Sequence, residues 1–121
     1  MHILTNSTKK KSIRAELETA DTDFKRVRGL MFRKEIVPIL FKFGFVGIFP
    51  IHSYFVNGEF DAVYLAAGGK VNEVFRRIPP NTALVSPKKK SSFLLELPVD
   101  MADKLRIEEG DVLRWKKVGD G

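Results

Sequence analysis

The sequence predicts an α+β fold that is mostly β: a compact antiparallel sheet or partly closed barrel that carries two short helices. Short segments rich in β-branched and aromatic residues recur along the chain, and turn-forming residues separate them. Only two segments carry helix-start and helix-stop signals. The 121 residues contain no repeat and no linker-like stretch, so we expect a single domain over residues 1–121.

The N-terminal part predicts two paired strands. Residues 2–5 are β-prone, and the polar residues 6–11 predict a turn. Residues 12–19 alternate between apolar and charged side chains, which is typical of a half-buried strand. We expect this strand to lie antiparallel to the first.

A short helix is predicted next. Asp21 or Thr22 is the candidate N-cap, because short polar side chains accept hydrogen bonds from the first turn. Phe24 and Val27 are three positions apart and therefore share one face. Gly29 suits the left-handed residue that ends a helix.

The rest of the chain predicts strands and one more helix. Gly44 and Gly47 indicate bulges or tight bends in the first of these strands. Asp100 is the candidate N-cap of a helix that runs to about Leu105. A turn around Gly110 leads into the last strand. The predicted strands are residues 37–49, 70–78, 92–97 and 112–116.

A hairpin is predicted around Asn57-Gly58, the dipeptide that most strongly signals a two-residue hairpin turn. Because side chains alternate between the two faces of a strand, His52 and Asp61 would become diagonal neighbours on one face. Tyr54 would lie on the same face. The sequence therefore predicts a polar patch in the most hydrophobic part of the chain.

The composition excludes several kinds of site. The chain has no cysteine, so disulfides, thiolate zinc sites and cysteine nucleophiles are excluded. With two histidines, His2 and His52, and no ligand spacing, we expect no metal site and no cofactor. The absence of glutamine and the many charged residues favour a thermophilic source.

No targeting or membrane segment is predicted, so we expect a cytoplasmic protein. The first eleven residues lack the apolar region of a signal peptide. The longest apolar run, residues 43–51, is far shorter than the roughly 20 residues that a membrane-spanning helix needs.

The net charge of +6 is concentrated in the first half of the chain and permits an anionic partner. Two lysine clusters are the candidate contacts for such a partner, an RNA or another polyanion. They are Lys9, Lys10 and Lys11, and Lys88, Lys89 and Lys90.

Three segments, in this order, resemble the family catalogued as domain of unknown function number 192. They are Arg28-Gly29-Leu30-Met31-Phe32-Arg33, the apolar segment with His52 and Asp61, and Leu95-Glu96-Leu97 followed by residues 107–112. The similarity covers residues 14–115. It implies a small β-rich domain without an assigned activity. It also implies a structural motif made of Arg28, Gly29, Asp61, Gly110 and Asp111.

The preferred interpretation is a ligand-binding or accessory module. Its ligand, an unknown small molecule or protein, would bind a concave patch of Arg28, His52, Tyr54 and Asp61. We expect the Asp61 carboxylate to pair with Arg28 or Arg33, because an arginine fork is the best partner for a buried carboxylate.

Two other functions stay open. One is single-stranded RNA binding through the basic loops that carry the two lysine clusters. The other is a hydrolase in which His52 acts as general base and Asp61 orients it. Because the sequence offers no nucleophile, it leans against an enzyme without deciding the question.

Overall fold

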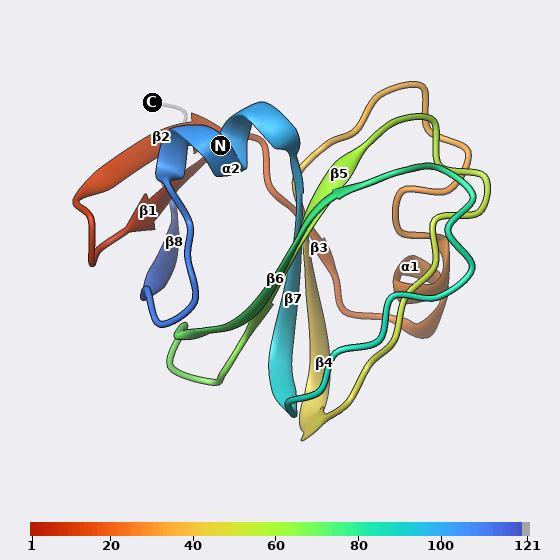
Figure 1. The fold of residues 1–121 in the computed structure, drawn as a ribbon. Helices are drawn as coiled ribbons and strands as arrows, with labels where there is room; N and C mark the ends of the chain where they lie inside the picture. The colour runs from red at the N-terminus through yellow and green to blue at the C-terminus, as the bar shows by residue number, and fades with distance from the viewer. Residues whose placement is uncertain (120–121) are drawn as a thin grey trace.

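The computed structural model describes residues 1–119, which form eight strands in two sheets and two short helices (Figure 1). The small sheet has the order β2-β1-β8, and the large sheet has the order β3-β4-β7-β5-β6. The small sheet consists of β1 (His2–Asn6), β2 (Lys11–Ala15) and β8 (Leu113–Lys117). The large sheet consists of β3 (Glu18–Ala20), β4 (Ile39–Gly47), β5 (Phe60–Leu65), β6 (Val71–Ile78) and β7 (Ser91–Pro98). The helices are α1 (Asp23–Arg28) and α2 (Val99–Leu105).

The predicted class, a mostly-β α+β fold, is confirmed, and the strands divide between two sheets. All strand pairs are antiparallel except β3 with β4, which is parallel. The strand predicted over residues 12–19 is broken, because β2 ends at Ala15 and the chain then crosses to the large sheet. In the small sheet β1 pairs with β8, so that His2 lies opposite Lys117.

The large sheet is the middle layer, with a hydrophobic core on each face (Figure 1). We call the core under the small sheet and α2 the first core. Its members include Leu4, Val63, Leu95, Leu97, Leu105 and Leu113. The second core lies on the other face, on the side of α1 and the long loops. Its members include Leu30, Ile39, Phe41, Val56, Phe60, Ala62, Tyr64 and Leu94.

Both helices form where the sequence predicts them. The Thr22 side chain accepts a hydrogen bond from the Lys25 N–H (3.2 Å), and Gly29 ends α1 with a φ of 46°. The N-cap prediction for α2 is wrong in one respect. Pro98 occupies the N-cap without a side-chain hydrogen bond, and Asp100 lies inside the first turn.

The predicted hairpin at Asn57-Gly58 is wrong. These residues lie in a loop, and neither has the positive φ that the favoured two-residue turn requires. The segment before them pairs elsewhere, since Ile51 forms a bridge with Val85. β5 is instead connected to β6 through a turn at Gly69. Glycine is required there because φ is 90° and because the Cβ of any other residue would clash with the Leu113 carbonyl oxygen.

Candidate ligand-binding pocket around Glu96

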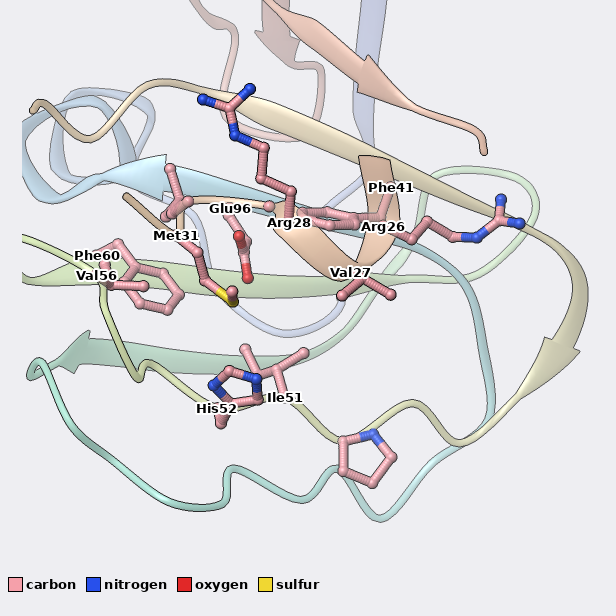
Figure 2. Close-up of a pocket in the computed structure, with 13 residues that line it drawn as sticks. Arg26, Val27, Arg28, Met31, Phe41, Ile51, His52, Val56, Phe60 and Glu96 are labelled. Atoms are coloured by element: carbon pink, nitrogen blue, oxygen red, sulfur yellow. The ribbon is translucent and has the colours of Figure 1, made fainter. Parts of the chain in front are cut away.

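A cavity of about 250 Å³ lies on the second-core face of the large sheet, between α1 and the segment around Ile51. Figure 2 shows Glu96 directed into this cavity from β7, with Met31 beside it and His52 on the facing wall. Apolar side chains and two arginines, Arg26 and Arg28, complete the lining. The apolar ones include Val27, Leu30, Phe41, Val56 and Phe60.

One wall is the loop that follows α1. Gly29 turns the chain with a positive φ, and a Cβ at this position would lie 3.1 Å from the Phe41 ring. The Arg33 Nε donates to the Gly29 carbonyl oxygen (2.9 Å), and its guanidinium forms an ion pair with Glu18 (2.7 Å). The predicted motif at Arg28-Gly29 therefore folds as a tight loop that brings Met31 to the cavity.

The facing wall is held by residues far along the chain. The backbone of Ile51 exchanges two hydrogen bonds with Val85 (3.0 and 2.7 Å). Buried Ser53 donates its hydroxyl to a backbone carbonyl (2.5 Å) and accepts a backbone N–H (2.8 Å). Between these anchors, the His52 Nδ1 accepts the Tyr54 N–H (3.1 Å). His52 is thereby fixed at the edge of the cavity.

The two walls also contact each other beyond the cavity. The Phe32 N–H donates to the Phe55 carbonyl oxygen (2.8 Å), and their rings stack with centroids 5.0 Å apart. The Asn57 side chain donates to the Lys34 carbonyl oxygen (3.3 Å). These contacts set the separation of the walls.

Glu96 is the central polar group of the pocket. It lies on β7 between β4 and β5, and its neighbours Leu95 and Leu97 belong to the first core. Alternation therefore places its side chain on the second-core face. Glu96 is only 5% exposed, and within residues 1–119 its carboxyl group has no hydrogen-bond or ion-pair partner. Burial raises the pKa of Glu96 to about 8, so the carboxyl group is mostly protonated at neutral pH.

Within the part of the chain that the structure describes, no cationic group forms an ion pair with Glu96. Arg26 donates to the Lys42 carbonyl oxygen (2.8 Å) and pairs with Asp23 (2.8 Å). Arg28 is exposed, and Figure 2 shows its guanidinium pointing away from Glu96. On β5, burial raises the pKa of Tyr64 strongly, and its hydroxyl donates to the Phe49 carbonyl oxygen (2.6 Å).

The four predicted ligand-binding residues separate into two groups. Arg28 and His52 line the pocket, whereas Tyr54 and Asp61 are not among its lining residues. Asp61 follows Phe60 on β5 and therefore lies on the opposite face of the large sheet. His52 and Asp61 are thus not neighbours, and the arrangement required for the hydrolase is not formed.

The predicted ion pair of Asp61 with Arg28 or Arg33 is also wrong. Asp61 is 1% exposed, and its Oδ1 accepts the Arg77 backbone N–H (2.7 Å). Burial raises the pKa of Asp61, and the Arg77 hydrogen bond together with the charge of Arg76 opposes this effect only in part. The carboxyl group therefore caps a neighbouring backbone amide and serves the architecture.

Asp111 ties two turns together. Its carboxylate accepts hydrogen bonds from the Asn6 side chain (2.8 Å) and the Glu108 N–H (3.0 Å), and it pairs with Lys9 (3.1 Å). Burial acts to raise the pKa of Asp111, but these bonds and the Lys9 charge outweigh it and lower the pKa. Gly110 beside it has a φ of 89°. These contacts describe how the pair is held, and its structural role stays a prediction.

The two lysine clusters lie on turns of different sheets. Lys9 is engaged by Asp111, whereas Lys10 and Lys11 are exposed at the end of the β1–β2 hairpin. Lys88, Lys89 and Lys90 precede β7 and are exposed. The Lys88 and Lys89 backbone N–H groups donate to the buried Glu73 carboxylate (2.9 and 3.0 Å).

The sequence-based selection of site residues missed Glu96. Its signal was present, because a glutamate between Leu95 and Leu97 in an apolar strand must lie on one of two buried faces. All three segments that carry the family resemblance contribute to this pocket, through residues 28–31, His52 and Glu96. Within residues 1–119, no group of three or more acidic or histidine side chains is arranged to hold a metal ion. In the same range, every helix is too short to cross a membrane.

Comparison with known proteins identifies similar chains. The profile of the family DUF192, described as uncharacterized ACR, matches residues 3–115. A UPF0127 protein of Thermococcus kodakarensis is 30% identical over 93% of this chain and 73% of its own. A UPF0127 protein of Pyrococcus furiosus is 29% identical over 93% of this chain and 97% of its own. These relatives come from thermophilic archaea, in agreement with the composition.

Two crystal structures share the fold. One is a candidate transcription regulator of Sinorhizobium meliloti, with a TM-score of 0.82 and 20% identity over 94% of this chain and 91% of that one. The other is a protein of unknown function from Novosphingobium aromaticivorans, with a TM-score of 0.78 and 19% identity over 94% and 83%.

Proposed function

The chain belongs to the family DUF192, and we propose that it is a small-molecule-binding module whose site is the pocket around Glu96. The proposal is carried by one observation. A carboxyl group that is only 5% exposed points into a cavity and has no partner within the described residues. Buried polar groups are nearly always hydrogen-bonded, and a buried group left without a partner costs roughly 1–3 kcal/mol. A ligand that bonds to Glu96 would remove this cost.

The cavity limits the ligand to a small one. At about 30 Å³ for each water-sized group, 250 Å³ holds a molecule of roughly eight such groups. Ligand sites typically combine apolar side chains, which bury the ligand, with a few polar groups, which orient it. Here Phe41 and Phe60 are among the apolar side chains, and Glu96 is the buried polar group. The hydrogen bonds of Ile51, Ser53 and Arg33 hold both walls in place without a ligand.

The test is a backbone amide NMR titration with a mixed panel of small molecules. We expect one or more compounds to shift the amide signals of Gly29, Met31, His52 and Glu96. Glu96→Gln should weaken this binding, whereas Glu109→Gln, at an exposed position, should leave it unchanged. If no compound shifts these signals, the proposal is wrong.

A second titration with short single-stranded RNA separates this function from the nucleic-acid alternative. Shifts at Lys10, Lys11 and Lys90 that disappear with added salt would support RNA binding through the lysine clusters instead. The pocket signals would then stay unchanged.

A further inference from the structure

We propose that the pocket binds an organic cation, an ammonium group carried on a small apolar body, whose ammonium pairs with the Glu96 carboxylate. This inference rests on the proposed function and adds the chemical class of the ligand. It starts from the charges around the cavity and from the apolar surface at its edge.

Among the described residues that line the cavity, Glu96 is the only acidic one. The guanidinium groups of the two arginines there are directed elsewhere. Arg26 is held by Asp23 and by the Lys42 carbonyl oxygen. Arg28 points toward solvent. An anionic ligand bound at Glu96 would therefore meet a carboxyl group, while the guanidinium groups of Arg26 and Arg28 are held or directed away from it. A cationic ligand would meet an acid that lacks a counter-ion.

The pairing of two charges favours an ammonium over a neutral ligand. A neutral ligand forms an ordinary hydrogen bond with the protonated Glu96, whereas an ammonium forms a charge-assisted one, which is about twice as strong. Glu96 is only 5% exposed, and Phe41 and Phe60 beside it are buried, so little water competes for the carboxyl group. The rings of Phe41 and Phe60 line the same cavity, and aromatic rings attract cations through their faces.

The apolar body of the ligand is accommodated by the surface of α1. This helix buries none of its side chains. Val27 is 73% exposed and lines the cavity, and Phe24 on the same helix face is 75% exposed. An apolar group attached to the ammonium can cover part of this surface, which water otherwise contacts.

Binding of an ammonium should release a proton. The protonated Glu96 gives its proton to the buffer, and the resulting carboxylate pairs with the ammonium, so the charge of the pocket stays balanced.

The other groups near Glu96 that carry or can gain charge are Arg26 and Arg28 on α1, His52 on the facing wall and Tyr64 on β5. Of these, only a histidine ordinarily changes its charge between pH 5 and 8.

The pH dependence follows from the pKa of Glu96, which is about 8. Below this value, only the ionised fraction of Glu96 can pair with the ammonium. Affinity for an ammonium should therefore rise about 50-fold between about pH 6 and pH 8. A ligand that needs the protonated carboxyl should behave in the opposite way and weaken above about pH 8.

The experiment compares three probes of matched shape, benzylamine, benzyl alcohol and benzoate, by amide NMR titration at about pH 6 and pH 8. We expect benzylamine to shift the signals of Gly29, Met31 and Glu96 and to bind about 50-fold more tightly at the higher pH. Glu96→Gln should remove the preference for the amine. His52→Asn should keep the pH dependence, which assigns it to Glu96.

The outcomes separate this inference from the proposed function. If benzyl alcohol or benzoate bound in the pocket as tightly as benzylamine at about pH 8, the cationic ligand would be overturned and the binding function would still stand. Amine binding that does not depend on pH would also overturn the inference. Failure of these probes and of the whole mixed panel to shift pocket signals would overturn both.

Discussion

Replacing Glu96 by glutamine should remove a loss of stability that the wild-type protein suffers as the pH rises. The pKa of Glu96 is raised by burial from its ordinary value of 4.5 to about 8. As the pH passes the ordinary value, the unfolded chain releases this proton while the folded protein keeps it. The free energy of unfolding therefore falls between about pH 4.5 and pH 8 and is level above that range.

The size of the effect follows from the same pKa. Each unit of pKa difference between two states is worth about 1.4 kcal/mol, so the full loss is on the order of 5 kcal/mol and roughly 3 kcal/mol is already lost at pH 7. Glutamine has nearly the same shape and does not ionise. Glu96→Gln should thus be more stable than the wild type at pH 8 by several kcal/mol and differ little from it near pH 4.5.

Urea unfolding at a series of pH values measures this difference, with the fluorescence of the half-buried Trp115 as the signal. The exposed Glu109→Gln variant is the control and should follow the wild type at every pH. Parallel pH profiles for wild type and Glu96→Gln would refute the reasoning, because they would show that the carboxyl group ionises as easily in the folded protein as in the unfolded chain.

Three further predictions concern the frame of the pocket and can be measured by the same urea unfolding. Gly29→Ala should lose about 1–3 kcal/mol because the new Cβ is strained at a φ of 46°, whereas Gly68→Ala, with open space around it, should lose little. Asp61→Asn should lose no more than about 1 kcal/mol, since an amide oxygen can still accept the Arg77 N–H; a loss of several kcal/mol would indicate an ion pair. Asp111→Asn should lose about 1–3 kcal/mol at neutral pH. Because the pKa of Asp111 is lowered on folding, its contribution is present above its ordinary value and is lost as the pH falls. A difference between Asp111→Asn and wild type that persists in acid would contradict this.

Elements with strong local signals could be predicted from the sequence. The helix that Thr22 caps and Gly29 ends is formed by contacts within eight residues, which the sequence displays directly. The hairpin at Asn57-Gly58 failed because a local turn preference lost to distant pairing. β5 is hydrogen-bonded to β6 on one side and β7 on the other, and Ile51 is paired with Val85, so no strand remains for the predicted partner.

The wrong hairpin prediction also explains why the predicted polar patch does not form. Placing His52 and Asp61 on one face depended on an unbroken hairpin between them. The loop that precedes β5 removes this relation, and Asp61 lies on the opposite face of the large sheet. Arg28 and His52 line one pocket with Glu96. The strand order that brings Glu96 to this pocket comes from long-range pairing, which no short sequence window contains.

The pairing of β1 with β8 affects the order in which the protein can fold during synthesis. All residues that line the pocket precede Leu97, whereas the first core needs Leu105, Ile107 and Leu113. Until β8 has left the ribosome, β1 and β2 form only a two-stranded hairpin, which is marginally stable alone. During this time Leu4 on β1 is not stably buried. The nascent chain therefore carries an exposed apolar surface until β8 is made, and during this interval it is most prone to aggregate.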